Sequence, residues 1–441
     1  MHIDLRSNSL DNLTATQFLF EFYKKRISAL EYAKSFVDRI EKYEKILGAW
    51  VCFDLDNFLK NAKKIDNSKI EINKFSLIGI PIGIKDIFNT LDFRTRYGSK
   101  ISYNINPGND ARVVTSLKNS GALIVGKTTT AEFGIHSPPK TKNPFSFDRI
   151  SGTSSTGSAV AVCSRMIPVS IGSQTAGSTS RPCSYLGIYG FKPSFGTIPR
   201  TAMLKTTDTL DCVTILGRSV NDLKLLFNAV RVYGRNYPII HKNLKEKKIN
   251  KKMRIGVLNG PKTKLLSNEV KKNFDKLCLK LSSECHKLNE LILPKFFDDA
   301  HYHHELIYCK SLSYYFNYEW SKERKSFSKV SSSMIERGLS ITNEDYFRSL
   351  KWQNRAQAVF ENCMKNFDFL ICPSTADNAP FLSEKEIDDH NLIWSLCRAT
   401  TITIPGLKGS DKLPVGLEIV GKRFDDYQIL EFAKKIDTII N

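Results

Sequence analysis

The segment "ISGTSSTGSAVAVCSRMIPVSIGSQTAGSTSRP", residues 150–182, decides the fold because two Ser/Thr-rich patches in it border a mainly apolar tract. The tract predicts first a helix, "GSAVAVCSRM" (157–166), and then a short buried strand, "IPVSIG" (167–172). Hydroxyl-rich patches occur both in flexible linkers and in polar pockets of folded domains. Because each patch directly adjoins apolar secondary structure, we predict that both lie in the folded core and not in a linker.

The same alternation of strand and helix continues on both sides of this segment. Upstream, the sequence predicts a strand that ends at Lys85, a helix over 110–121 and a strand over 122–126. Downstream, it predicts strands over 253–258, 367–373 and 414–421 and helices over 268–281 and 425–436. This alternation favours an α/β fold with a large mixed β-sheet core covered by helices on both faces.

Two helices are expected before the first strand. Thr14 with Gln17, and Ser28 with Glu31, form capping-box patterns that satisfy the free N–H groups of a helix start. A long helical tract is expected later, and it carries many aromatic residues (Tyr314, Tyr315, Phe316, Tyr318 and Trp320). Aromatic residues at helical spacing belong more often to a core than to a pocket.

We expect a single domain over residues 1–441. Its parts are an N-terminal helix pair at 14–46, a core at about 75–230, a variable helical tract at about 295–366, and a C-terminal strand and helix at 413–440. No internal repeat is apparent.

The composition argues for a cytoplasmic protein. Hydrophobic residues make up 41% of the chain, enough for a large buried core. No apolar run approaches the ~18 residues of a membrane span, and the N-terminus lacks the layout of a signal peptide. The 10 Cys residues are scattered singly, which indicates reduced, mostly buried thiols rather than disulfides or a zinc site.

The chain carries a net charge of +20, which raises the question of a nucleic-acid partner. The basic residues are spread widely, and the one dense run, "HKNLKEKKINKKMR" (241–254), is typical of a solvated connection. Charge alone therefore does not favour nucleic acid as a partner.

Two segments resemble ligand-binding motifs, a P-loop and a metal site, but their sequence context argues against both. "GALIVGKT" (121–128) fits the P-loop pattern, but its variable residues are apolar and predict a buried strand, not a loop that wraps phosphate. The cluster His301, His303 and His304 has no carboxylate or Cys at ligand spacing, so a solvated helix face is favoured over a metal site.

A nucleophilic Ser in the patches would need a proton acceptor. His136 is the only His near the patches in sequence. Lys85 is the alternative, because an apolar strand leads into it, and burial lowers a lysine pKa from its usual value of about 10.4. A neutral amine is a competent general base. The other interpretation of Lys85, equally open from spacing, is a strand-end lysine that reaches water or pairs with Asp86.

Three motifs together resemble the amidase signature hydrolases. They are "GIPIGIKDIFNT" (79–90), "ISGTSSTGSAVAV" (150–162) and "IGSQTAGSTSRPCSYLGIYGFKPSFGTIPR" (171–200). Other segments follow in the family's order, among them "GALIVGKTTTAEFG" (121–134), "FDFLICPSTADNAP" (367–380) and "LPVGLEIVGKRFDD" (413–426). The resemblance covers nearly the whole chain and implies the amidase signature fold.

The resemblance also implies a Ser–cis-Ser–Lys triad. The nucleophile would be Ser178, the proton-bridging serine Ser154, and the general base Lys85. The oxyanion hole would use the backbone N–H groups of Thr175, Ala176 and Gly177, with that of Ser178 itself. No metal and no organic cofactor is implied.

The family holds the bridging serine after a cis peptide, so we expect one between Thr153 and Ser154. Thr153, Thr156 and Ala176 stand where many members have Gly, which leaves backbone strain and pocket size open. Ser155 and Ser158 match family positions, and Ser155 is expected to support the loop. Arg181 is expected to be a structural ion-pair partner or, as the less favoured alternative, a contact for an anionic substrate.

The sequence therefore predicts an amidase that hydrolyses a linear carboxylic amide of a small molecule through an acyl-enzyme. The alternative is the A subunit, the glutaminase, of a glutamyl-tRNA amidotransferase, which shares these motifs. Gln174 and Ala176 depart from the usual "SDTGGS" of that branch and favour the stand-alone enzyme. A non-catalytic relative is a third class, disfavoured because all three triad positions are occupied. A homodimer is compatible with the sequence, and no membrane partner is expected.

Overall fold

The computed structural model describes residues 2–5, 9–68, 74–101, 108–137, 140–233, 244–246, 249, 252–284 and 287–440. The charged run 241–254, predicted to be a solvated connection, lies largely outside these residues.

One mixed sheet forms the centre of the molecule, with the strand order β1-β3-β2-β4-β6-β5-β10-β11-β9-β7-β8. The strands are β1 (Trp50–Phe53), β2 (Pro81–Lys85), β3 (Leu123–Thr128), β4 (Val169–Gln174), β5 (Tyr189–Lys192), β6 (Cys212–Gly217), β7 (Arg254–Asn259), β8 (Lys287–Ile292), β9 (Phe369–Pro373), β10 (Thr400–Lys408) and β11 (Pro414–Gly421). The large mixed sheet predicted from the sequence is confirmed.

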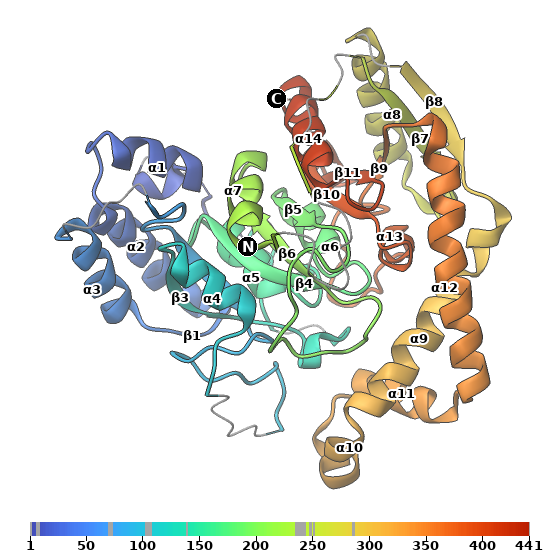
Figure 1. Cartoon of the computed structure of the whole chain (residues 1–441), viewed down its shortest axis with the longest axis horizontal. Coiled ribbons are helices and arrows are strands. Elements are labelled where there is room, and N and C mark those ends of the chain that lie inside the picture. The colour runs from blue at the N-terminus through green and yellow to red at the C-terminus, as the bar shows by residue number, and fades with distance from the viewer. Residues whose placement is uncertain are drawn as a thin grey trace.

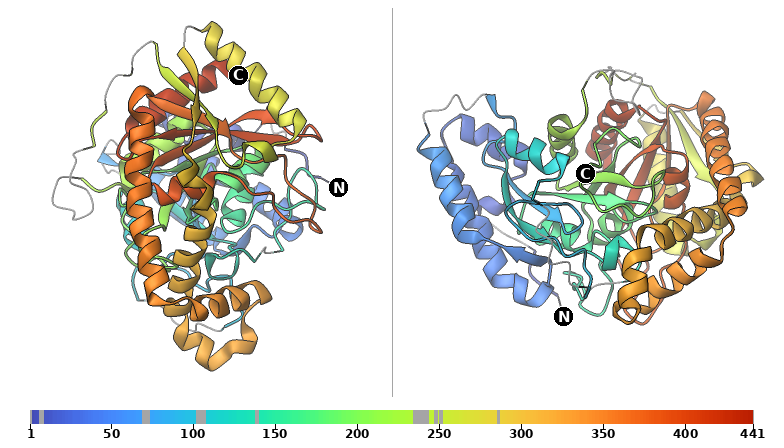
Figure 2. Two further views of the ribbon diagram at one scale, coloured as in Figure 1. Left: turned by 90° about the vertical axis from the view of Figure 1, so that its right-hand side faces the viewer. Right: turned by 60° about the horizontal axis from the view of Figure 1, so that its bottom comes forward.

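Helices surround this sheet, with two groups at its opposite ends (Figures 1 and 2). At one end lie α1 (Ala15–Tyr23), α2 (Ala29–Leu47) and α3 (Leu55–Asp66), and at the other α9 (Ala300–Tyr315), α10 (Asn317–Glu323), α11 (Lys329–Ser340) and α12 (Asn343–Cys363). The remaining helices are α4 (Arg112–Asn119), α5 (Thr156–Cys163), α6 (Ser180–Leu186), α7 (Val220–Val230), α8 (Asn268–Ser283), α13 (Asn391–Leu396) and α14 (Asp426–Ile440).

Both predicted capping boxes are present at the starts of α1 and α2. The side chain of Thr14 accepts a hydrogen bond from the backbone N–H of Gln17, and that of Ser28 accepts one from Glu31. In each case the residue at the third helical position bonds back to the N–H of the capping residue, so two free helix N–H groups are satisfied.

The long helical tract consists of several helices and not one. Ser328 caps α11 and Thr342 caps α12, so each of these two helices begins anew at its own capped N-terminus. The aromatic residues divide between two environments. Phe316 and Trp320 belong to a buried cluster, whereas Tyr314 is 77% exposed. The expectation that these aromatics form core is thus correct for only part of the set.

The register of the central strands brings the polar patches together. β2 runs parallel to β4, with Ile84 opposite Ile171, so the carboxyl ends of the two strands meet at one edge. Lys85 is the last residue of β2, and the "SQTAGS" patch follows β4 at the same edge. The chain therefore delivers a lysine and both hydroxyl patches to one place.

The P-loop-like segment is the strand β3, as expected from its apolar residues. Lys127 of that segment is buried within β3 and forms an ion pair with Asp86 at 3.0 Å. Its backbone is engaged with the neighbouring strands β1 and β2 and is not free to wrap a phosphate.

Candidate active site

Lys85 lies at the centre of a cluster of serine hydroxyls. Its Nζ is 2.5 Å from the Oγ of Ser154, 3.0 Å from that of Ser155 and 2.8 Å from that of Ser173. All four side chains are buried. Ser173, on β4, is a member of this cluster that the sequence motifs did not indicate.

Lys85 has no carboxylate partner within ion-pair distance among the described residues, because the neighbouring Asp86 points elsewhere. Asp86 pairs with Lys127, whose Nζ also donates to Phe88 O and Thr95 Oγ1. The two alternatives kept open for Lys85, exposure to water and pairing with Asp86, are therefore both wrong. Burial lowers the pKa of Lys85 to about 7, opposed in part by the negative charge of Asp211.

The hydrogen bonds distinguish the two adjacent serines. Ser155 Oγ donates its proton to the carbonyl of Ser173 at 3.0 Å, and it accepts from Lys85 Nζ and from the Ser173 N–H. A hydroxyl has one proton and two lone pairs, so Ser155 has no capacity left. Ser154 Oγ has Lys85 as its only hydrogen-bond partner among the described residues, which leaves its proton able to move.

Ser178 lies in the turn between β4 and α6, beside the lysine cluster. Its carbonyl accepts a hydrogen bond from the N–H of Ser155 at 3.3 Å, which joins the two patches. Gly152 (φ +92°) allows a second close approach, because a Cβ there would lie 2.6 Å from Pro182 at the start of α6. In the described part of the chain, no hydrogen bond links the hydroxyls of Ser154 and Ser178.

Residues 175–178 form a loop, here called the oxyanion loop, whose carbonyls all point into the protein. Each of the four carbonyls accepts one hydrogen bond from a surrounding element. The donors are His304 Nε2 to Thr175 O (3.2 Å), Ser395 Oγ to Ala176 O (3.3 Å), Arg181 N to Gly177 O (3.0 Å) and Ser155 N to Ser178 O (3.3 Å).

The N–H groups of the same four residues have no acceptor in the portion of the structure that is described. Within a trans peptide the C=O and N–H bonds point in opposite directions. The carbonyls of Thr175, Ala176 and Gly177 share their peptide planes with the N–H groups of Ala176, Gly177 and Ser178, so anchoring these carbonyls turns those three N–H groups away from the anchoring donors. Four adjacent unpaired donors beside a serine hydroxyl match the arrangement that binds a tetrahedral oxyanion.

Asp211 holds the oxyanion loop from a further side. Its carboxylate accepts from Thr175 Oγ1 at 2.7 Å. It also accepts from the backbone and hydroxyl groups of Thr206 and Thr207. Its charge is thus compensated by hydrogen bonds, so it anchors the loop without pairing with Lys85. Nothing in the local sequence around Asp211 predicted this contact.

The cis peptide expected before Ser154 is absent: no peptide bond in the described residues is cis. The trans form is the lower in energy for a non-proline residue, and from it the Ser154 hydroxyl reaches Lys85. Thr153 and Thr156 are accommodated in buried positions. Thr156 Oγ1 bonds with Ser151, whereas Thr153 Oγ1 has no partner in the described structure.

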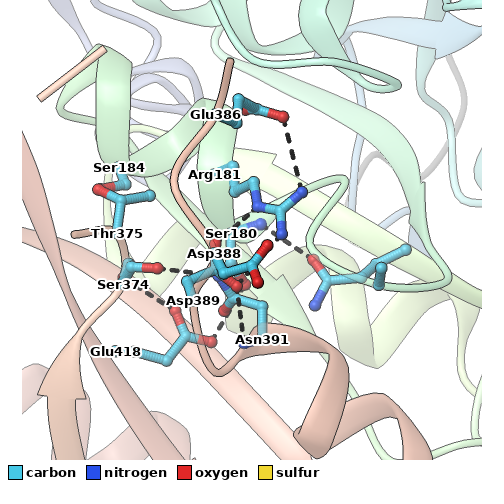
Figure 3. Close-up of polar contacts among 12 residues, drawn as sticks. Ser180, Arg181, Ser184, Ser374, Thr375, Glu386, Asp388, Asp389, Asn391 and Glu418 are labelled. Atoms are coloured by element: carbon cyan, nitrogen blue, oxygen red, sulfur yellow. Dashed lines mark hydrogen bonds and ion pairs between the residues drawn. The ribbon is translucent and has the colours of Figure 1, made fainter. Parts of the chain in front are cut away.

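Arg181 is buried between two carboxylates (Figure 3). Its Nε lies 2.6 Å from Asp389 Oδ2, and its Nη1 lies 3.6 Å from Glu386 Oε2. These neighbours hold the pKa of the guanidinium above its usual value despite burial. Arg181 thus takes part in two ion pairs, and these contacts tie α6 to the segment before α13.

Gln174 and Glu418 organise the start of α6. Gln174 Oε1 accepts from the N–H groups of Thr179 and Ser180, while its Nε2 is buried without a partner in the described structure. Glu418 accepts from the hydroxyls of Ser180, Ser374 and Thr403, contacts that Figure 3 shows in part. The neutral amide side chain of Gln174 therefore caps the first turn of α6.

The histidine cluster does not form a solvated face, so that expectation is wrong. His303 and His304 are buried on α9, where His303 Nδ1 bonds with Ser349 Oγ at 3.1 Å. His304 contacts the oxyanion loop instead. No group of three or more potential metal ligands occurs in the described residues. His136, the other candidate proton acceptor, forms no hydrogen bond with a serine hydroxyl among the described residues. Burial lowers the pKa of its imidazole to about 4.

Nine of the 10 Cys residues lie in the described ranges, and all nine are free thiols. Among the described helices, none is both long enough and apolar enough to cross a membrane.

A comparison with protein families matches residues 31–430 to the amidase family. A curated relative is the Glutamyl-tRNA(Gln) amidotransferase A subunit of Sulfurihydrogenibium sp. (strain YO3AOP1), 30% identical over 94% of this chain and 94% of its own. The protein of the same name from Fusobacterium nucleatum is 28% identical over 98% of this chain and 97% of its own.

Solved structures of similar fold include one described as an amidase, with a TM-score of 0.88 and 22% identity over 97% of this chain and 100% of that one. Another is the structure of the Glutamyl-tRNA(Gln) amidotransferase A subunit of Thermotoga maritima. It has a TM-score of 0.79 and 21% identity, and the match covers 98% of this chain and 94% of that one. These likenesses support the fold assignment.

Proposed function

The chain belongs to the amidase family, and from this premise we propose that it hydrolyses a carboxylic amide through an acyl-enzyme on Ser178. The products are a carboxylic acid and ammonia or an amine. The contact between the buried Lys85 Nζ and Ser154 Oγ, at 2.5 Å, is the observation that carries this proposal.

In the proposed reaction, neutral Lys85 accepts the proton of Ser154 while Ser154 accepts that of Ser178. Ser178 Oγ then attacks the amide carbon, and the C=O electron pair moves to the oxygen. The N–H groups of Thr175, Ala176, Gly177 and Ser178 stabilise the oxyanion that forms. Returning the proton through Ser154 to the amide nitrogen breaks the C–N bond.

Water completes the cycle. With Lys85 neutral again, a water molecule loses a proton through Ser154 and attacks the acyl carbon, and Ser178 leaves with its hydroxyl restored. The path requires Ser154 and Ser178 to come within hydrogen-bond distance when substrate binds. Such contacts often tighten only in the substrate complex.

We propose that the substrate is a small molecule with a linear amide and that the reaction takes place in the cytoplasm. A single amidase domain over residues 1–441 would suffice for this chemistry. Arg181 is already compensated by Asp389 and Glu386, which supports a structural role and argues against recognition of an anionic substrate by this guanidinium.

A second candidate is the glutaminase component of a tRNA-dependent amidotransferase. The curated relatives at 26–30% identity carry that amidotransferase name, and the alignment covers nearly the whole chain. In that case glutamine would be the amide, ammonia would pass to a partner protein, and nucleic acid would be contacted by the assembly. Gln174 and Ala176 still distinguish this chain from the usual motif of that branch.

Ammonia release separates the two candidates. The purified chain is incubated with a panel of aliphatic, aryl and anionic amides and with glutamine, and Ser178→Ala serves as the inactive control. Turnover of simple amides by the isolated chain supports the stand-alone enzyme. The second candidate is supported if glutamine is the one amide of the panel that is hydrolysed, and if its hydrolysis requires a partner protein.

A further inference from the structure

We propose that His304 is a positioning residue that holds the oxyanion loop in its active arrangement through a hydrogen bond from its Nε2 to the carbonyl of Thr175. This inference rests on the function proposed above. It assigns a role in the reaction to the helical tract, which lies far from the signature motifs in sequence.

The contact fixes a peptide plane of the loop. The Nε2 of His304 lies 3.2 Å from Thr175 O. The same trans peptide carries the N–H of Ala176, which points in the opposite direction. While His304 is hydrogen-bonded to this carbonyl, the Ala176 N–H points away from His304, where no described residue accepts a hydrogen bond from it. Releasing the carbonyl would let this plane rotate and would misdirect one oxyanion donor.

The protonation of His304 follows from the chemistry of its partner. A carbonyl oxygen only accepts hydrogen bonds, so Nε2 must carry the proton. The ring is 5% exposed, and burial lowers its pKa to about 3, which keeps it neutral near pH 7. The neutral ring has one N–H, and that N–H is committed to the loop.

The surroundings of His304 make the contact rigid. The ring packs edge-on against Tyr308, one turn further along α9, with centroids 5.7 Å apart. Tyr308 is buried and also packs against His136. A second helix acts in the same way on the next peptide, because Ser395 of α13 donates to Ala176 O at 3.3 Å.

The adjacent residue provides a matched control. His303 is also buried on α9, at 9% exposed, and its ring stacks on Trp352 with centroids 4.6 Å apart. Its Nδ1 bonds with Ser349 on α12 and not with the loop. Leucine at either position would disturb the packing of α9, but only His304→Leu would release Thr175.

The test measures steady-state kinetics and thermal stability for wild type, His304→Leu, His304→Gln and His303→Leu, on an amide the wild type hydrolyses. Ser178→Ala is measured first, since undiminished turnover by that variant would refute the proposed function whatever His304 does. For His304→Leu we expect kcat to fall by about 10- to 100-fold with KM changed less than about 3-fold, because an oxyanion donor acts mainly in the transition state. Glutamine can place an N–H near the position of Nε2, so His304→Gln should recover most of kcat.

His303→Leu should keep kcat within about 3-fold of wild type even where its melting temperature falls as much as that of His304→Leu. Equal losses of kcat in the two leucine variants would overturn the proposal, because they would show a general effect of α9 packing. An unchanged kcat in His304→Leu would also overturn it. If both leucine variants fail to fold, His304→Phe replaces His304→Leu, because phenylalanine keeps a ring against Tyr308 but cannot donate to Thr175 O. An unchanged kcat in His304→Phe would then contradict the positioning role.

Discussion

Lys85 Nζ lies 2.5 Å from Ser154 Oγ at an edge of the sheet where both side chains are buried. The carboxylate next to Lys85 in sequence pairs with Lys127, so within the described ranges no ion pair fixes the charge of Lys85. The lysine can therefore be neutral near pH 7 and can exchange a proton with a serine.

Replacing Lys85 with Met should abolish the proton exchange while filling the same volume. We expect kcat/KM to fall by at least about 10³-fold, a loss typical of removing a general base that activates a nucleophile. The measurement is ammonia release on an amide that wild type hydrolyses. Folding of the variant is checked by circular dichroism, and turnover near the wild-type rate would disprove the role of Lys85.

The pH dependence of catalysis should report the same lysine. Because Lys85 must be neutral to accept a proton and its pKa is lowered to about 7, kcat/KM should rise with pH up to about 7 and level off above it. An ordinary lysine would give a rise continuing to about pH 10.4. A rate profile of the wild-type enzyme between pH 5 and 10 distinguishes the two.

Stability should depend on pH through the same group. Between about pH 7 and 10.4 the unfolded chain holds a proton on Lys85 that the folded chain lacks, so this lysine makes the free energy of unfolding rise with pH. Lys85→Met removes that contribution. We therefore expect Lys85→Met to become steadily less stable relative to wild type as the pH rises across this range. The measured quantity is the difference between the two free energies of unfolding, obtained by urea denaturation at each pH. A difference independent of pH would contradict the lowered pKa.

The Asp86–Lys127 pair should be worth much more than a surface ion pair. Both side chains are fully buried, so Asp86→Asn leaves the lysine without its counter-charge. We expect a loss of about 3–5 kcal/mol in the free energy of unfolding. The double variant Asp86→Asn, Lys127→Met should recover part of this loss because it removes the unpaired ammonium. If the single variant is as stable as wild type, the pair does not hold β2 and β3 together.

Arg181 offers a test of substrate charge. Since Asp389 and Glu386 already compensate the guanidinium, Arg181→Met should lower stability and reduce kcat/KM for anionic and neutral amides by the same factor. The ratio of kcat/KM for a matched anionic and neutral substrate is the quantity to compare. A selective loss of at least about 10-fold for the anionic amide would instead assign substrate binding to Arg181.

Much of this site follows from local sequence, and the rest depends on contacts between distant segments. The capping boxes, the strand that ends at Lys85 and the core position of both hydroxyl patches are local patterns, and the structure confirms them. His304 contacts Thr175 across 129 residues of sequence, which no local period encodes. The same is true of the contact of Asp211 with the oxyanion loop.

The sequence also failed where two local interpretations compete. Asp86 adjoins Lys85 and is a natural partner for it, but the parallel pairing of β2 with β3 puts Lys127 beside Ile84, and the Lys127 side chain forms the ion pair with Asp86 instead. Short strands such as β5, with four residues, show too few periods to be identified. The histidine cluster appeared solvated because its partners lie on other elements, among them Ser349 on α12.

The most direct test of the proposed mechanism is to identify the residue that forms the covalent intermediate. The protein is treated with a fluorophosphonate, digested, and the modified peptide is identified by mass spectrometry. We predict one adduct, on Ser178, which is lost in Ser178→Ala and forms at least about 100-fold more slowly in Lys85→Met and Ser154→Ala. An adduct on Ser154, Ser155 or Ser173, or turnover of amides by Ser178→Ala, would contradict the mechanism.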